Sequence, residues 1–203
     1  MRSRQERERE YRRESIIEAT EQLLNEKGFE SITMDDIAIK SDFAKASIYQ
    51  YFKNKDELMS AVFSKALEMQ CCLIEEKCLS QTDSVQAIRN FIKLEFDFIC
   101  QNPWMPKVSA TVVSIGFNAE TRLVELYEHK KKLISAIIQR GQTGGTFIMS
   151  DQVVLTNMIL CVSAGFANYS STRISADLQT PVIDMLIATI VKGIKRGSSN
   201  ESN

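Results

Sequence analysis

Residues 45 to 52, Lys-Ala-Ser-Ile-Tyr-Gln-Tyr-Phe, place a cation, small residues and polar aromatic side chains within two turns of a possible helix. At about 100° per residue, Ala44, Ile48, Tyr51 and Phe52 share an arc as wide as a core-facing stripe. The opposite arc holds Lys45, Ala46, Ser47, Tyr49 and Gln50. Small residues allow close approach, and the polar side chains can hydrogen-bond phosphates or base edges. This pattern favours a DNA-reading helix over a merely solvated one.

The neighbouring residues predict the helices that must position this face. A helix over residues 14–27 ends at Gly28, the residue type that most often terminates a helix. The run Thr33–Asp36 has the form of a capping box and predicts a helix of about two turns, with a turn at Ser41 and Asp42. The next short helix covers about residues 44–52, and Asn54 caps a long helix after it. Three helices of falling length, with a turn of about four residues between the last two, followed by a long helix give a helix-turn-helix layout.

The amino terminus carries a run of charges. Six arginines fall within residues 1–13, interleaved with Glu6, Glu8 and Glu10, although the net charge of the chain is -1. Such a run is either a basic arm beside the DNA-binding helices or a solvated charged tail.

Composition predicts an all-α protein. The 203 residues include only 8 Gly and 3 Pro, which leaves few residues to punctuate a many-stranded sheet. We find no run of about 18 uncharged apolar residues, and the amino terminus is charged where a signal peptide would be apolar. We therefore expect a cytoplasmic protein with no membrane partner.

Catalytic groups are not evident in the sequence. It has one histidine, no phosphate-binding glycine loop and no cluster with metal-ligand or nucleophile spacing, so we predict no enzyme activity, cofactor or metal. His129 lies among Glu128 and residues 130–132, which we expect on a solvated face. Cys71 and Cys78, seven residues apart, are expected in the core. The adjacent Cys71 and Cys72 keep a redox-sensing regulator open as an alternative.

Residues 16 to 63 resemble the DNA-binding domain of the tetracycline-repressor (TetR) family of bacterial transcriptional regulators. The matching features are the Gly28-Phe29 turn, Thr33, Ile37-Ala38, the run Ser47–Phe52, and Lys55 with Glu57-Leu58. The resemblance implies a homodimeric repressor that binds a double-stranded DNA operator and leaves it when a small effector binds elsewhere.

When the contact positions of the family are transferred to this sequence, the resemblance implies that five residues contact bases or nearby phosphates: Lys45, Ala46, Ser47, Tyr49 and Gln50. It implies backbone contacts for Thr33, Tyr51 and Lys55. The chain departs from the family at Asp42, where glycine is usual, and at Ala44, where a capping Ser or Thr is usual. The expected fold is an N-terminal helix-turn-helix domain, residues 1–55 with residues 1–13 as the basic arm, joined by a long helix to a ligand-binding and dimerisation domain, residues 56–203.

Amphipathic helices are expected in this larger domain over residues 85–100, 106–115 and 120–140, followed by a loop at 141–145 and a helix opened by Asp151. They could enclose a pocket for a largely apolar effector, lined by Phe91, Phe98, Trp104, Met105, Val112, Tyr127, Asn157 and Cys161. The alternative for each of these residues is an ordinary core position.

The last two expected helices are apolar on nearly every side. Residues 152–169 are largely apolar or small, and apolar residues nearly encircle the helix over 181–193. A helix that one core cannot cover indicates a helical dimer interface, or else a fully buried helix in a monomer. The residues predicted at the interface are Ser163, Ala164, Gly165, Ala167, Met185, Leu186, Thr189 and Ile190.

Overall fold

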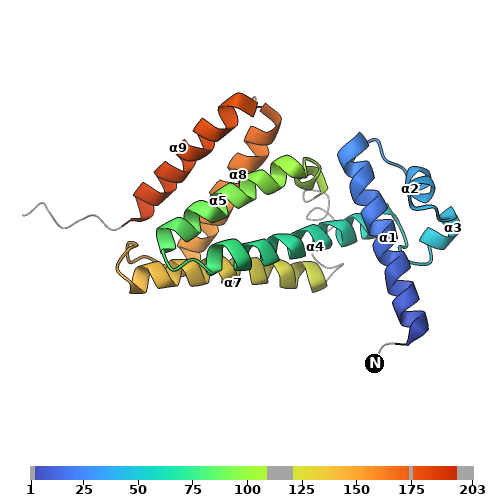
Figure 1. Ribbon diagram of the computed structural model, residues 1–203, viewed down its shortest axis with the longest axis horizontal. Coiled ribbons are helices and arrows are strands. Elements are labelled where there is room, and N and C mark those ends of the chain that lie inside the picture. The colour runs from blue at the N-terminus through green and yellow to red at the C-terminus, as the bar shows by residue number, and fades with distance from the viewer. Residues whose placement is uncertain (1–2, 109–120, 174–175, 196–203) are drawn as a thin grey trace, which may run out of the picture. The chain divides into compact units, whose positions relative to one another are not determined.

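The structure, a computed structural model, describes residues 3–108, 121–173 and 176–195 (Figure 1). The helices are α1 (Arg4–Lys27), α2 (Met34–Ser41), α3 (Lys45–Ile48), α4 (Lys55–Ile74), the π-helix η1 (Glu75–Leu79), α5 (Ser84–Gln101), α7 (Thr121–Thr143), α8 (Gln152–Arg173) and α9 (Ala176–Ile194). Within these residues the β pairing is a single isolated bridge between Phe147 and Lys195. The predicted all-α fold is confirmed.

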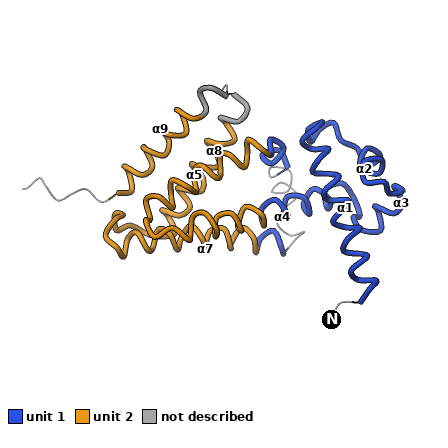
Figure 2. The backbone as a smooth tube through the Cα atoms, in the orientation of Figure 1, with its two compact units in different colours: residues 1–67, 102–124 blue, residues 68–101, 125–203 orange. Residues whose placement is uncertain are grey.

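The chain forms two compact units (Figure 2). Unit 1 comprises residues 1–67 and 102–124, and unit 2 comprises residues 68–101 and 125–203. The division falls inside α4, between Leu67 and Glu68, so this helix contributes residues to both units. The sequence-based domain boundary at 55/56 lies in the first turn of α4 and stays a prediction.

Unit 1 is built on α1, which packs against α2. Helix α1 buries Ile16, Ile17 and Leu24, and it ends at Gly28, whose positive φ of 77° suits a residue without a Cβ. It begins at Arg4, much earlier than the expected residue 14, because Ser3 and Glu6 form a capping box. Residues 4–13 of the predicted basic arm therefore form the first turns of α1.

The predicted capping box at the start of α2 and the predicted turn after it both form. The Thr33 hydroxyl accepts a hydrogen bond from the Asp36 backbone N–H at 3.2 Å, and Asp36 Oδ2 accepts one from the Thr33 N–H at 2.9 Å. Asp42 then takes the left-handed conformation, with φ 57° and ψ 32°, where the family usually has glycine. Asp tolerates this region better than most residues, so the turn between α2 and α3 is preserved.

Unit 2 has its own apolar core. Helix α5 packs against α8, α9 and η1. The loop after α7 closes one end, because the Phe147 ring is fully buried against Gly141 and the Ile148 N–H donates to the Ile194 carbonyl at 2.8 Å. Gly141 lies within α7, so the helix extends past the expected end at residue 140.

A charged cluster lies inside unit 2. The Lys130 ammonium on α7 donates to Glu95 Oε1 at 2.6 Å and to Gln70 Oε1 at 2.8 Å, and it lies 5.9 Å from the centroid of the Phe91 ring. Lys130, Glu95 and Gln70 are all buried. The expectation that residues 130–132 share a solvated face is thus wrong for Lys130. The cluster ties the end of α4 to α5 and α7.

Helix α8 leaves much of its apolar surface exposed. Val153, Val154, Met158, Val162 and Tyr169 are all exposed. By length and composition alone, the stretch Gln152–Tyr169 could cross a membrane, which is weak support for a span. By length and composition, the expectation that no stretch of the sequence could span a membrane is therefore wrong for Gln152–Tyr169.

Candidate nucleic-acid interface

The short helix α3 presents a polar outer face. Lys45, Ala46, Tyr49 and Gln50 are exposed and Ser47 is half-buried. On the opposite side Ile48 and Phe52 are buried in the core of unit 1. The helical spacing correctly placed Ile48 and Phe52 inside, but Ala44, expected on the same inner arc, is exposed because it precedes the first turn of the helix. The α-helix itself ends at Ile48, and the chain continues as turns through Tyr51. No side chain caps α3 at Ala44, where the family usually has Ser or Thr.

The cation on this face is held by a neighbouring helix. Lys45 Nζ lies 2.8 Å from Asp35 Oδ1, and both side chains are exposed. The hydrogen bond that the Lys45 ammonium donates to the Asp35 carboxylate raises the pKa of Lys45. An exposed ion pair is worth little and exchanges partners readily, so a phosphate can take the place of Asp35.

Thr33 and Lys55 have structural contacts. The Thr33 hydroxyl serves the α2 cap, as described above. Lys55 Nζ donates to the carbonyls of Ile32 at 2.8 Å and Phe29 at 3.2 Å, and it lies 5.0 Å from the Phe29 ring centroid. Lys55 therefore ties the start of α4 to the loop between α1 and α2.

Helix α4 begins beside this surface with the expected cap. Asn54 Oδ1 accepts a hydrogen bond from the Glu57 N–H at 2.8 Å, and Glu57 Oε2 accepts one from the Lys53 N–H at 2.6 Å. Tyr51, just before it, is half-buried and borders a groove together with Gln50 and residues of α1.

The residues expected around an effector are distributed between the two units. Phe91 and Phe98 are buried on α5 and Tyr127 is half-buried on α7, all in unit 2. Trp104 and Met105 are buried in unit 1. Asn157 and Cys161 are exposed on α8, so within the single chain they do not line a shared enclosed pocket with the α5 residues. Val112, and most of the helix expected over 106–115, lie outside the described residues.

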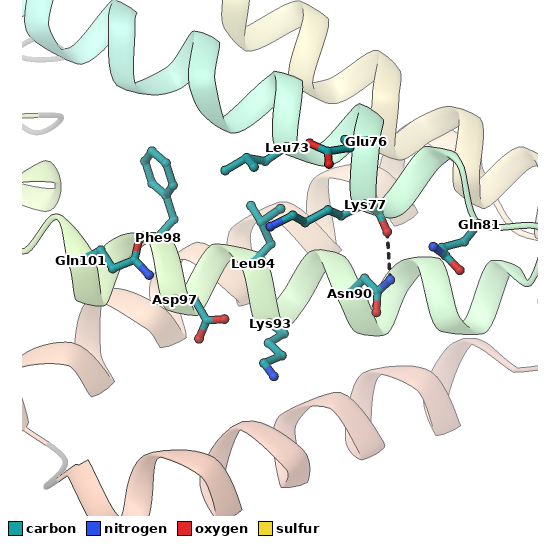
Figure 3. A pocket seen from close by; sticks show the side chains of 10 residues that line it. All are labelled: Leu73, Glu76, Lys77, Gln81, Asn90, Lys93, Leu94, Asp97, Phe98 and Gln101. Atoms are coloured by element: carbon teal, nitrogen blue, oxygen red, sulfur yellow. Dashed lines mark hydrogen bonds between the residues drawn. The ribbon is translucent and has the colours of Figure 1, made fainter.

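A groove of about 550 Å³ runs between the end of α4, η1 and α5 in unit 2 (Figure 3). In this view Phe98 lies toward one end, Leu73 and Leu94 lie near the middle, and Asn90 and Gln81 lie toward the other end. The other residues that line it are Glu76, Lys77, Lys93, Asp97 and Gln101. Of the eight residues expected from the sequence it contains Phe98, and its lining is more polar than expected.

The π-helix η1 forms one wall of this groove. The Asn90 side-chain amide donates to the Lys77 carbonyl at 2.9 Å (Figure 3), and Arg140 Nη1 donates to the Leu79 carbonyl at 3.1 Å. Side chains from α5 and α7 thus satisfy carbonyls of this irregular turn. Single π-helical turns occur often at functional sites.

The structure divides the predicted dimer residues among buried, half-buried and exposed positions. Ser163 and Ala167 are buried inside their own unit, which removes them from an exposed face of α8. Gly165, Met185 and Thr189 are exposed, and the remaining three residues, Ala164, Leu186 and Ile190, are half-buried. The exposed Val154, Met158 and Val162 on α8 were missed by the sequence analysis.

Two of the five cysteines offer little to redox chemistry, whereas Cys72 of the adjacent pair is exposed. Cys71 and Cys78 are buried, as expected, and burial raises the pKa of each thiol to about 11. Because the thiolate is the reactive form, both thiols are poorly disposed to oxidation.

His129 is exposed on α7, and its Nε2 lies 3.0 Å from Glu75 Oε1. The described residues hold no group of three or more metal-ligating side chains.

Comparison with known proteins supports the resemblance. Residues 16–62 match the profile of the family described as "Bacterial regulatory proteins, tetR family". The chain is 26% identical over 132 residues to the Transposon Tn10 TetC protein of Escherichia coli, covering 64% of this chain and 66% of that protein. It is 29% identical over 91 residues to the HTH-type transcriptional activator FasR of Mycolicibacterium smegmatis, covering 45% of this chain and 42% of FasR. These matches thus span less than two thirds of either relative.

The fold also matches solved structures along most of the chain. A TetR transcription regulator from Haloarcula marismortui superposes with a TM-score of 0.73 at 18% identity, covering 92% of this chain and all of that one. At this identity the likeness concerns the fold. The family profile covers the capped helices and the polar face of α3, and the fold match extends through both units. Residues 16–62 thus carry the domain of the tetR family of bacterial regulatory proteins, and the chain has the fold of a solved TetR transcription regulator.

Proposed function

We propose that the protein is a dimeric, effector-responsive repressor that binds an inverted-repeat DNA operator through α3. The observation that carries this proposal is the outer face of α3, where Lys45, Ala46, Tyr49 and Gln50 project from a helix fixed by buried residues. In helix-turn-helix proteins the second helix of the motif enters the major groove, and two subunits bind half-sites separated by turns of the duplex. Phosphate contacts position such a protein and base contacts give it sequence specificity.

Each proposed contact residue has a distinct role. Tyr49 and Gln50 would contact base edges, while Ala46 and Ser47 allow the helix to approach them. Lys45 would exchange Asp35 for a phosphate. Tyr51 would bind the backbone beside α3, and Thr33 and Lys55 would act chiefly by holding α2 and α4 in place.

Dimerisation would bury the exposed apolar surface of α8 and α9. Val154, Met158 and Val162 on α8 and Met185 on α9 are exposed in the single chain. Exposed apolar side chains gathered on neighbouring helices mark an interaction surface. Gly165 permits close approach of a second backbone, and Asn157 and Cys161 would lie on or beside this interface rather than against an effector. A cytoplasmic location follows from this account, since the apolar face of α8 would be covered by a second copy.

The effector would bind in unit 2 and shift the equilibrium between two dimer states. A ligand changes operator affinity only by as much as its own affinity differs between those states. The groove beside η1 supports an amphipathic effector, because Leu73, Leu94 and Phe98 lie beside the polar and charged side chains of the same lining. In this proposal residues 1–55 form the DNA-binding domain and residues 56–203 form the ligand-binding and dimerisation domain, and α4 connects the two.

Fluorescence anisotropy with labelled operator tests the DNA-binding part. We expect Tyr49→Ala and Lys45→Ala to weaken binding strongly, while Lys40→Ala serves as the matched control. Lys40 is also an exposed lysine of unit 1 in an ion pair, with Glu26 at 2.7 Å, but it lies outside α3. Equal loss in all three variants, or none, would reject α3 as the reading element.

The direction of regulation needs a separate measurement. FasR is named as an activator, so similarity to known transcriptional regulators does not fix the direction of regulation. Transcription in vitro from a promoter that contains the selected operator should fall when the protein is added. A rise would replace repression by activation without affecting the DNA-binding proposal.

A further inference from the structure

A second groove lies beside the recognition helix, in unit 1. It has a volume of about 380 Å³ and is lined by Gln5, Glu8, Arg9 and Arg12 of α1 and by Gln50 and Tyr51 after α3. All four α1 residues precede residue 16, where the family match begins. The first turns of α1 extend past α3 in Figure 1, so this wall of the groove belongs to the helical arm of this chain.

The lining is suited to a phosphodiester backbone. It offers two guanidinium groups, two carboxamides and a phenol, all side chains that hydrogen-bond phosphate oxygens in protein–DNA complexes. Arginine presents several N–H donors in a fixed fork that matches phosphate geometry. A merely solvated arm would not need these groups to converge on side chains that follow α3.

One acidic residue lines the same groove. Glu8 Oε1 lies 2.6 Å from Arg12 Nη2, and the two side chains are 54% and 47% exposed. Such an exposed pair contributes little to stability, so Arg12 can exchange Glu8 for a phosphate at small cost. The Glu8 carboxylate itself would repel a phosphate, and its removal should therefore strengthen binding.

We propose that this groove binds the phosphate backbone of the DNA duplex that α3 reads. The inference rests on the proposed function, and it adds contacts outside the matched family domain. Gln50 belongs both to the outer face of α3 and to the groove, and Tyr51 follows it directly. A strand that leaves the bases contacted by α3 would meet Arg9 and Arg12 next, which lengthens the footprint on each half-site.

The test is a salt titration of DNA binding by the full-length chain. Two double variants remove the same charge from the same helical arm: Arg9→Gln/Arg12→Gln inside the groove, and Arg4→Gln/Arg7→Gln, which are not among the residues that line it. Each phosphate contact contributes about 0.9 to the slope of log K against log salt concentration. The groove variant should lower the magnitude of that slope by about 1.8 per chain bound. It should weaken specific and non-specific DNA binding by the same factor, and the control should change the slope much less.

Glu8→Gln provides a second measurement with the opposite sign. We expect it to tighten DNA binding, an outcome that misfolding cannot mimic. Equal slopes for the two double variants, or weaker binding by Glu8→Gln, would overturn the groove proposal while operator binding by the wild type persists. Absence of salt-dependent DNA binding by the wild type would instead reject the proposed function itself.

Discussion

Gly165 provides a test in which one methyl group has different effects on the subunit and on the dimer. The residue is exposed on α8, and a Cβ atom added there would meet no heavy atom within 4 Å. Glycine inside a helix costs about 0.5–1 kcal/mol relative to alanine. Gly165→Ala should therefore raise the free energy of unfolding of the single subunit by about that amount.

Gly141 on α7 supplies the matched comparison. A Cβ atom there would collide with the ring of Phe147, which is fully buried. Overpacking of a core costs about 1–3 kcal/mol, and the same gain in helix propensity offsets about 0.5–1 kcal/mol of it. Gly141→Ala should lower the free energy of unfolding by up to about 2 kcal/mol, so the same substitution changes sign between the two helices.

The dimer should respond to Gly165→Ala in the other direction. If a second copy packs closely on α8, the added methyl group costs about 1–3 kcal/mol at the interface. The dissociation constant of the dimer then rises about tenfold for every 1.4 kcal/mol. Sedimentation equilibrium measures this constant, and chemical denaturation below the dissociation constant measures the subunit alone. An unchanged dissociation constant together with the expected subunit stabilisation would refute close packing at Gly165.

Three further predictions concern polar contacts within each unit. Glu95→Gln leaves the buried Lys130 ammonium without its carboxylate, so it should lower the free energy of unfolding by about 3–5 kcal/mol in chemical denaturation. The double variant Glu95→Leu/Lys130→Met removes both charges and should recover most of that loss. Wild-type stability of Glu95→Gln would contradict this prediction. Thr33→Ala should cost about 1 kcal/mol by removing the α2 cap, and Thr33→Ser should not, so equal stability of the two would exclude the cap as the cause. The hydrogen bonds from Lys27 and Thr33 hold the pKa of Asp36 below its ordinary value of 3.8, so its carboxylate stabilises the fold fully above that pH and progressively less as the pH falls toward the folded-state pKa. In urea unfolding at a series of pH values, the advantage of the wild type over Asp36→Asn should be constant near neutral pH and shrink below about pH 4; an advantage that grows with acidification would contradict the sign.

The parts of unit 1 that depend on short-range chemistry were predictable. The capping residues Thr33, Asp36 and Asn54 and the terminating Gly28 all act as the sequence indicated. These contacts join residues only three or four positions apart, so no knowledge of distant packing is needed. Asp42 follows the same logic, since its left-handed backbone is a property of the turn itself.

The early start of α1 was missed because its first turns lack an apolar stripe. Residues 4–13 are almost all charged or polar, so hydrophobic periodicity carries no signal there. The capping pair Ser3 and Glu6 was the available indication. Recognising it would have placed the arginines on a helix, although the groove with Gln50 and Tyr51 depends on tertiary packing.

In unit 2 most helices could be predicted from the sequence, but the environment of their side chains could not. Helix α8 is apolar on several sides, and periodicity therefore cannot tell the buried Ser163 and Ala167 from the exposed Met158 and Val162. Packing against residues that are distant in the sequence decides which side chains of α8 are buried. The Glu95–Lys130 pair had a usable signal, because Glu95 occurs in register with the apolar positions of its helix.

Selection of DNA from a random duplex pool tests the central claim, that the outer face of α3 reads sequence. The wild type should enrich an inverted repeat whose half-site centres lie about 10 base pairs, or a multiple of that, apart. Tyr49→Ala should lose or alter the preference within each half-site while Lys40→Ala retains it. Enrichment of no sequence by the wild type, or of the same sequence at the same affinity by Tyr49→Ala, would contradict the account.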